Sequence, residues 1–206
     1  MAAAAAPFSL REVLDAFRRC VTEQREVLLE PYLSGWRGLI REAEGFLSLE
    51  VFYSGLTLRC CGAFIHCSAK EPREENISLF FSELRPGLAA LRARPDSGCR
   101  TVLRLHRALR WLQLFLEGLR SGDPRTSVLC TDAYNASLAE HHPWVVRKAA
   151  TVAFCALPSR DAFLEIMNVG SAEEAVAMLG EAIPYIGDVY SITQELFAQH
   201  KLLDLP

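Results

Sequence analysis

Between residues 100 and 119 the sequence has a long helical pattern with one broad apolar side. On a helical wheel, at about 100° per residue, the apolar arc consists of Leu105, Ala108, Leu112, Phe115, Leu116 and Leu119. The opposite arc is polar and consists of His106, Arg110, Gln113, Glu117 and Arg120. A helix of this length and pattern has to bury its apolar side against other elements. We therefore expect the rest of the fold to be built around it.

Start and stop signals predict further helices on both sides of this pattern. A capping box of Ser9 and Glu12 starts a helix to about residue 29, which Pro31 breaks before a second helical pattern begins. Later helices are predicted at about 125–140, 144–157, 159–168 and 171–200. The first of these starts after Asp123-Pro124, and the last is expected to kink at Pro184.

The predicted fold class is all-α, a two-layer helical sandwich in a single domain over residues 1–206. The helix at 144–157 is apolar on nearly every side, so we expect it to be central. Residues 42–91 are the exception to the helical pattern. The stretch 54–62 has no helical period, and a charged break follows at 70–76.

Composition excludes several function classes. No apolar run reaches the roughly 18–20 residues needed to span a bilayer, and the alanine-rich start at 1–7 lacks the basic region of a secretory signal. The odd number of cysteines, 7, fits a reducing compartment. With 22 Lys and Arg against 25 Asp and Glu, nucleic-acid binding is not expected. These features favour a cytosolic protein.

Catalytic and metal-binding patterns are also lacking in the sequence. Cys60, Cys61, His66 and Cys67 have metal-ligand chemistry but not the paired spacing of a zinc site. No nucleophile motif, phosphate-binding loop or dinucleotide fingerprint occurs. We therefore expect neither an enzyme nor a bound cofactor or metal.

Arginines on the apolar side of the 100–119 helix are the strongest functional signal. Arg104 falls inside the apolar arc, and Arg100 lies beside it one turn earlier. Guanidinium groups withdrawn from water need an anion, and two of them one turn apart match the oxygens of a phosphate. The alternatives are pairing with Asp or Glu, or extension to the surface. Arg107, at the edge of the arc, and Arg110 are expected to be solvated.

A second candidate cluster lies at the junction His142-Pro143-Trp144. A histidine at a helix junction can face a pocket, although it can equally be a structural hydrogen-bonding group. Trp144 is suited to a membrane interface because an indole has one polar and one apolar side. Its alternative place is the core.

The sequence resembles the glycolipid-transfer-protein superfamily. The resemblance is carried by residues 98–109, 111–116, 134–138, 142–146, 163–165 and 202–206, together with 8–41. It covers most of the chain apart from the divergent segment at about 42–91. It implies a sandwich of two helical layers that encloses both chains of a lipid and holds the headgroup at the surface.

The resemblance also implies roles for individual residues. In the phosphate-selective branch of the family, Arg100 and Arg104 match the arginines that bind phosphate, whereas the glycolipid-selective branch has tryptophan at the second position. His142 matches the histidine that bonds the ceramide amide region, and Trp144 matches the membrane-docking tryptophan. Arg94 matches a further basic residue of the headgroup site.

The expected function is thus binding and intermembrane transfer of a phosphorylated sphingolipid, ceramide-1-phosphate. The expected protein is a cytosolic monomer that touches intracellular membranes and the inner face of the plasma membrane transiently. No nucleic-acid partner is expected.

The divergent segment departs from the family's headgroup site. The family's second helix carries an Asp and, four residues later, a Lys, but this chain has no Asp between Asp15 and Asp96. Counting without gaps puts Leu56 and Cys60 at those positions. Such a site should attract phosphate but discriminate poorly among anionic lipids. Glu44 or Glu50 could supply a substitute carboxylate. The alternative function is a helical interaction protein with an incomplete lipid site and little or no transfer activity.

Overall fold

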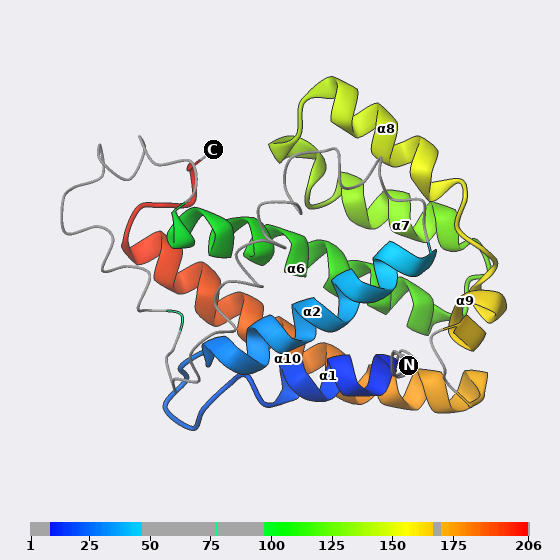
Figure 1. Ribbon diagram of the computed structural model, residues 1–206, viewed down its shortest axis with the longest axis horizontal. Helices are drawn as coiled ribbons and strands as arrows, with labels where there is room; N and C mark the ends of the chain where they lie inside the picture. Colours follow the sequence, from blue (N-terminus) through cyan, green and yellow to red (C-terminus); the bar gives the residue numbers. More distant parts are fainter. Residues whose placement is uncertain (1–8, 47–76, 78–96, 167–169, 206) are drawn as a thin grey trace, which may run out of the picture.

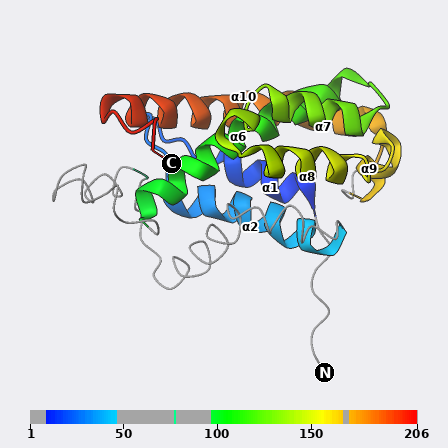
Figure 2. The same cartoon turned by 90° about the horizontal axis from the view of Figure 1, so that it is seen from above.

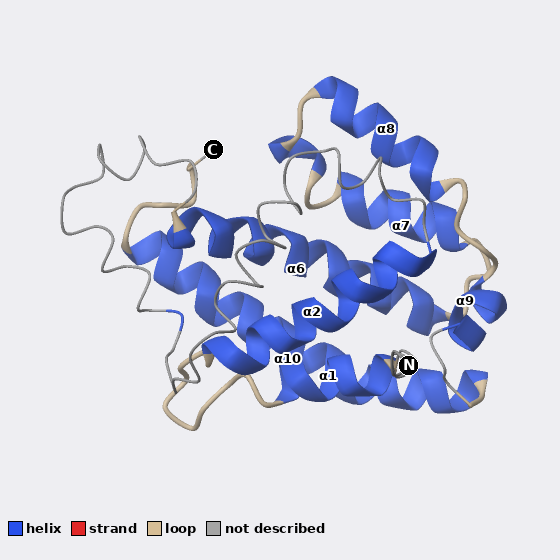
Figure 3. Ribbon diagram, viewed as in Figure 1, coloured by secondary structure: helices blue, strands red, loops and turns tan. Residues whose placement is uncertain are grey.

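The computed structural model describes residues 9–46, 77, 97–166 and 170–205. The described helices are α1 (Leu10–Arg18), α2 (Leu29–Phe46), α6 (Gly98–Ser121), α7 (Thr126–Asn135), α8 (Trp144–Phe154), α9 (Arg160–Ile166) and α10 (Ala172–Gln199), with a short 3-10 turn, η3 (Ala139–His141). These residues contain no β-strand, and helices joined by loops account for them (Figure 3). The all-α prediction is confirmed. The expected divergent segment lies outside the described residues from residue 47 to residue 91, except for Ile77.

Helix α6 occupies the middle of the molecule. It packs against α10 and α7, while α1 packs against α2 and α10. In Figure 1, α2 crosses in front of α6 and α10 runs behind it. The view from above agrees, with α2 on one side of α6 and α10 on the other (Figure 2). Side chains from α1, α2, α6, α7 and α10 join in one apolar core.

A serine and a glycine terminate the two ends of α6. Ser97 has extended backbone, and its hydroxyl accepts a hydrogen bond from the Arg100 amide at 3.2 Å, as an N-cap should. At the other end Gly122 has φ +86°, a left-handed conformation that suits glycine after a helix. The helix expected from about residue 100 to 119 is therefore confirmed, with a slightly longer range.

The prediction of one helix from Ser9 to residue 29 is wrong. Helix α1 ends at Arg18, and the chain folds back through a short antiparallel contact between Val21 and Val27. Arg25 has φ +60° in this turn. Pro31 does not break a helix either, because it lies in the first turn of α2, where the backbone N–H groups have no helical partner.

Two glycines of α2 allow α1 to approach closely. A Cβ atom at Gly35 would lie 2.9 Å from the Phe17 ring, and one at Gly38 would lie 2.6 Å from Val13 Cγ2. The Phe17 ring also meets the Trp36 ring edge to face, with centroids 6.0 Å apart. The tight α1–α2 pair therefore depends on the absence of side chains at these two positions.

Helix α8 is peripheral, contrary to the prediction that it is central. Its buried residues are Ala150 and Phe154, whereas Val145 and Val152 are 68% and 72% exposed. An apolar composition on all sides does not decide burial when only one side of a helix meets the core. Figure 1 shows α8 at the edge of the molecule, beyond α7.

The remaining boundaries differ in detail from the predictions. Helix α7 starts two residues after Pro124, because the Asp123 carboxylate accepts from the Arg125 amide at 2.9 Å and forms a turn first. Helix α10 begins where the last helix was predicted, after Ser171, whose hydroxyl accepts a hydrogen bond from the Glu174 amide. Ser9 stands at the N-cap of α1 but makes no such side-chain bond.

Within the described ranges, no helix is both long enough and apolar enough to cross a membrane. Cys20, Cys99 and Cys130 are buried free thiols, while Cys155 is exposed. Burial raises the pKa of Cys20 to about 12. Such a thiol stays protonated and behaves as a small apolar side chain.

Candidate functional site

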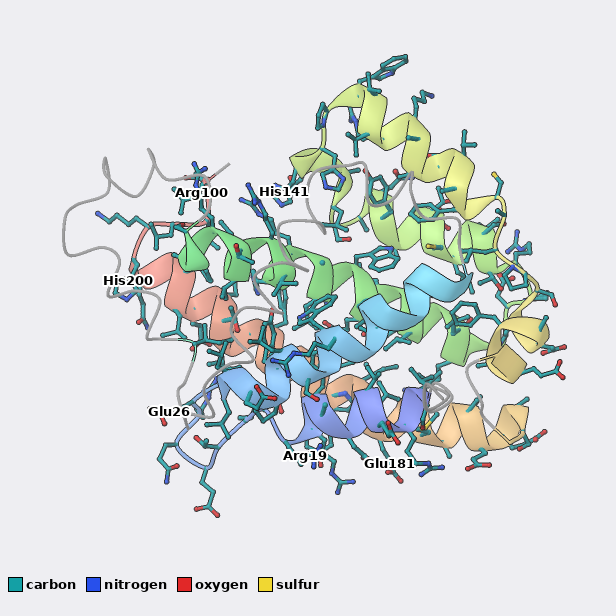
Figure 4. All side chains as sticks on the ribbon, viewed as in Figure 1. Arg19, Glu26, Arg100, His141, Glu181 and His200 are labelled. Atoms are coloured by element: carbon teal, nitrogen blue, oxygen red, sulfur yellow. The ribbon has the colours of Figure 1, made fainter. Side chains whose placement is uncertain are left out.

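The first two turns of α6 carry the predicted arginine pair. Arg100 is 7% exposed and Arg104 is half-buried, so the Arg100 side chain is withdrawn from water and the Arg104 side chain is partly so. The Arg104 side chain makes no hydrogen bond or ion pair with any residue that the structure describes. Pairing of Arg104 with an Asp or Glu of this part of the chain is therefore excluded. Figure 4 shows Arg100 and His141 on the same edge of the molecule.

Arg107 was expected to be solvated, and this prediction is wrong. Its Nη2 donates to the carbonyl oxygens of Leu203 at 2.6 Å and Leu205 at 2.9 Å, so the side chain is half-buried. Arg110 is also half-buried, with its guanidinium 5.7 Å from the centre of the Tyr190 ring. A helical wheel considers only the side chains of one helix. It does not show which other segments of the protein pack over that helix.

The turn η3 brings two histidines to the same region. Both His141 and His142 interact electrostatically with Arg107, which in turn interacts with Arg104. Glu140 provides a negative charge near Arg107. Arg104, Arg107 and the two histidines therefore form one cluster, although helix α7 separates α6 from η3 in the sequence.

The orientation of His142 is fixed from α7. The Tyr134 hydroxyl lies 2.7 Å from His142 Nδ1, and the Tyr134 side chain is buried. His142 has extended backbone, which the following Pro143 favours. Burial lowers the pKa of His142, and the charges of His141 and Arg107 lower it further. The ring is therefore neutral near pH 7, and one of its nitrogens carries the single N–H.

His106 does not belong to the solvated side where the wheel placed it. It is 1% exposed, stacks on Tyr190 with ring centroids 4.3 Å apart, and lies 2.6 Å from Gln194 Oε1. Burial lowers the pKa of His106 to about 4 despite the bond to Gln194. Helix α10 covers this side of α6, so His106 is a structural residue.

Trp144 is exposed, which excludes its alternative place in the core. Its exposed fraction is 63%, and it lies at the first turn of α8. Val145 and Val152 are exposed on the same helix, as are Arg147 and Lys148. Exposed apolar residues beside basic ones suit contact with an anionic lipid surface.

Several predicted positions lie outside the described residues: Arg94, Glu50, Leu56, Cys60, Cys61, His66 and Cys67. Glu44 lies within α2, but its side chain is not described. The structure brings His142 close to Arg107, which interacts with Arg104, and Arg100 lies one turn before Arg104 on α6. Trp144 follows His142 at the start of α8.

Sequence reasoning missed Arg107 and its partner segment at residues 202–205. It also missed the contact of Tyr134 with His142. A spacing of eight residues between a tyrosine and a junction histidine was the only local signal for that contact.

The cluster combines positive charge, a neutral histidine and adjacent apolar helices. This arrangement suits an anionic amphiphile, whose charged group meets the arginines while its apolar part enters the core. In the described ranges no three His, Cys, Asp or Glu side chains are grouped to hold a metal ion.

Comparison with known proteins agrees with a lipid-binding site. The sequence profile described as "Glycolipid transfer protein (GLTP)" matches residues 68–169. The match thus includes the later part of the segment that was expected to diverge. The ceramide-1-phosphate transfer protein of Bos taurus is 54% identical over 207 residues, which cover 97% of each chain.

Solved structures agree in fold. The crystal structure of mouse ceramide-1-phosphate transfer protein in its apo form has a TM-score of 0.84 at 48% identity, over 97% of this chain and 100% of that one. The human protein in complex with 12:0 ceramide-1-phosphate has a TM-score of 0.80 at 47% identity, with the same coverage. The resemblance found in the sequence is confirmed, and so is the fold it implies.

Proposed function

The chain belongs to the glycolipid transfer protein family, and we propose that it binds ceramide-1-phosphate and transfers it between membranes. The observation that carries the proposal is the arginine pair on α6. Arg104 has no partner among the described residues, although it is half-buried and follows buried Arg100 by one turn. The half-buried guanidinium of Arg104 is stabilised by an anionic ligand, and a phosphate monoester, which carries about two negative charges, matches its geometry.

In this mechanism the arginines bind phosphate oxygens and His142 binds the polar part of the ceramide. With Nδ1 directed at the Tyr134 hydroxyl, the second ring nitrogen of His142 is left to meet the lipid. A neutral ring suits this role because a nitrogen N–H can donate to an amide or hydroxyl oxygen. No bond is made or broken, so transfer requires binding and release alone.

Membrane contact is assigned to the exposed face of α8. Trp144 and the exposed valines would enter the interface, while Arg147 and Lys148 meet anionic headgroups. The proposed setting is the cytosol, with transient contact with intracellular membranes and the inner face of the plasma membrane.

The test is binding and transfer of ceramide-1-phosphate by Arg104→Leu. Loss of one charged hydrogen bond should weaken binding by about tenfold or more, with helicity nearly unchanged. Arg120→Leu is the matched control because this exposed arginine of α6 lies at the opposite end of the helix. Equal binding by Arg104→Leu and the unmodified protein would reject the phosphate role.

Native mass spectrometry of protein purified from cells separates the proposal from the alternative. A co-purifying phosphorylated sphingolipid supports lipid transfer. If the folded protein carries no lipid and takes none from vesicles, the alternative of a helical interaction protein is supported instead. That alternative rests on the ungapped count that puts Leu56 and Cys60 at the positions of the family's Asp and Lys.

A further inference from the structure

A single arginine joins two parts of the chain that lie far apart in the sequence. Arg107 Nη2 donates to both the Leu203 and the Leu205 carbonyl oxygens, at 2.6 and 2.9 Å. One donor group therefore holds the backbone of residues 202–205, here called the tail segment, against α6. Figures 1 and 2 both show this end of the chain beside the N-terminal part of α6.

The tail segment is anchored by its own side chains as well. Leu202 and Leu205 are 0% and 2% exposed, and Leu203 packs against the core. Lys201 has φ +56°, which turns the chain out of α10, and the Leu202 amide donates to the Phe197 carbonyl at 3.0 Å. The segment thus follows a defined path back over α6 instead of continuing the direction of α10.

This path lies next to the proposed headgroup site. Arg107 interacts electrostatically with Arg104, with Glu140 of η3 and with Asp204 of the tail segment. The two carboxylates compensate part of the positive charge that Arg107 adds beside Arg104. Arg107 Nη2 already donates to two backbone oxygens. This nitrogen therefore holds the tail segment and is not available to bind phosphate.

We propose that Arg107 is a positioning residue that fastens the tail segment across one side of the headgroup site. This inference rests on the proposed function and deepens it. A fastened segment excludes water from the side of Arg104, and the attraction between a guanidinium and a phosphate is stronger where water is excluded. Release of the segment would expose the site and leave two carbonyl groups to be solvated elsewhere.

The first part of the test needs no lipid. Hydrogen exchange of the tail amides is measured in the unmodified protein, Arg107→Leu, Arg107→Lys and Arg110→Leu. Arg107→Leu should lose protection over residues 202–205, whereas Arg107→Lys should keep most of it, because an ammonium can also donate to two carbonyls. Arg110→Leu is the matched control, since Arg110 contacts Gln113 and Tyr190. Unchanged protection in Arg107→Leu overturns the inference.

The second part measures affinity for ceramide-1-phosphate in phosphatidylcholine vesicles. Arg107→Leu should weaken binding by about tenfold, with Arg107→Lys close to the unmodified protein. Leu205→Ala, which loosens the same segment without changing a charge, should also weaken binding. The double variant Arg107→Leu/Leu205→Ala should lose less than the two single losses combined, because both act through one segment.

If the losses of affinity in the two single variants add up in the double variant, the inference is overturned. It is also overturned if Arg107→Leu binds ceramide-1-phosphate with full affinity although its tail segment has lost protection. A failure of the proposed function is distinguishable from both. In that case the unmodified protein does not bind ceramide-1-phosphate, while the exchange experiment still reports whether Arg107 holds the tail. Melting curves of every variant identify one that fails to fold, and Arg107→Lys and Leu205→Ala then carry the test.

Discussion

The Tyr134 hydroxyl and His142 Nδ1 lie 2.7 Å apart, so a buried side chain of α7 fixes the ring of a histidine that follows η3. Burial raises the pKa of Tyr134, which keeps its hydroxyl protonated at neutral pH. When that hydroxyl donates to Nδ1, the proton of the neutral imidazole resides on the other nitrogen. The tyrosine then selects the tautomer that can donate to a ligand.

Tyr134→Phe should therefore weaken ceramide-1-phosphate binding by a factor of about 5–10, the effect of one neutral hydrogen bond. The Phe ring keeps the packing against Phe154, so the melting temperature should change little. Tyr190→Phe is the matched control, because its ring stacks on His106 and lies outside the site. If both variants bind alike, Tyr134 does not orient His142 for the ligand.

Trp144→Ala should slow transfer between vesicles and reduce vesicle association. Because the side chain is 63% exposed, binding of a soluble short-chain ceramide-1-phosphate should persist. Val128→Ala, an exposed apolar position on α7, serves as the control for loss of apolar surface. Equal loss in the transfer and short-chain assays would contradict a docking role.

Gly38→Ala should destabilise the fold, whereas Gly187→Ala should not. A methyl group at Gly38 would meet Val13 Cγ2 at 2.6 Å, and overpacking of this kind costs about 1–3 kcal/mol. At Gly187 the nearest atom is Gln113 Nε2 at 3.4 Å, the end of a flexible side chain. There alanine should gain up to about 1 kcal/mol of helix propensity. Urea unfolding of both variants measures the difference.

Stability should fall between about pH 6.5 and pH 4 because of His106. Its pKa in the folded protein is lowered to about 4, mainly by burial. The unfolded chain takes up a proton at higher pH than the folded one, so acid favours unfolding across this window. The loss from this group is on the order of 3 kcal/mol.

His106→Gln should reduce that pH dependence. The bond to Gln194 raises the pKa of His106, whereas the charges of Arg107 and His141 lower it. Replacement removes the titrating group, and denaturant unfolding at several pH values compares the two slopes. Identical slopes would mean that His106 does not titrate in this range.

Local signals predicted helix α6 well. Ser97 and Gly122 mark its ends, and capping and left-handed termination depend on a few neighbouring residues. Arg104 could also be assigned to an apolar stripe from the wheel alone, because that position depends only on helical geometry. The end of α1 was harder to predict from the sequence, because no local signal requires the chain to fold back between Val21 and Val27.

The sequence by itself determined the helical class, most helix positions and the two arginines that face the apolar side of α6. Only the tertiary structure decided which sides of the helices are covered. His106 and Arg107 are withdrawn from solvent because α10 and the tail segment, about ninety residues later, lie over them. Val145 and Val152 are exposed because no described element covers that side of α8. Burial depends on which distant segments pack together, and helical periodicity carries no information about that choice.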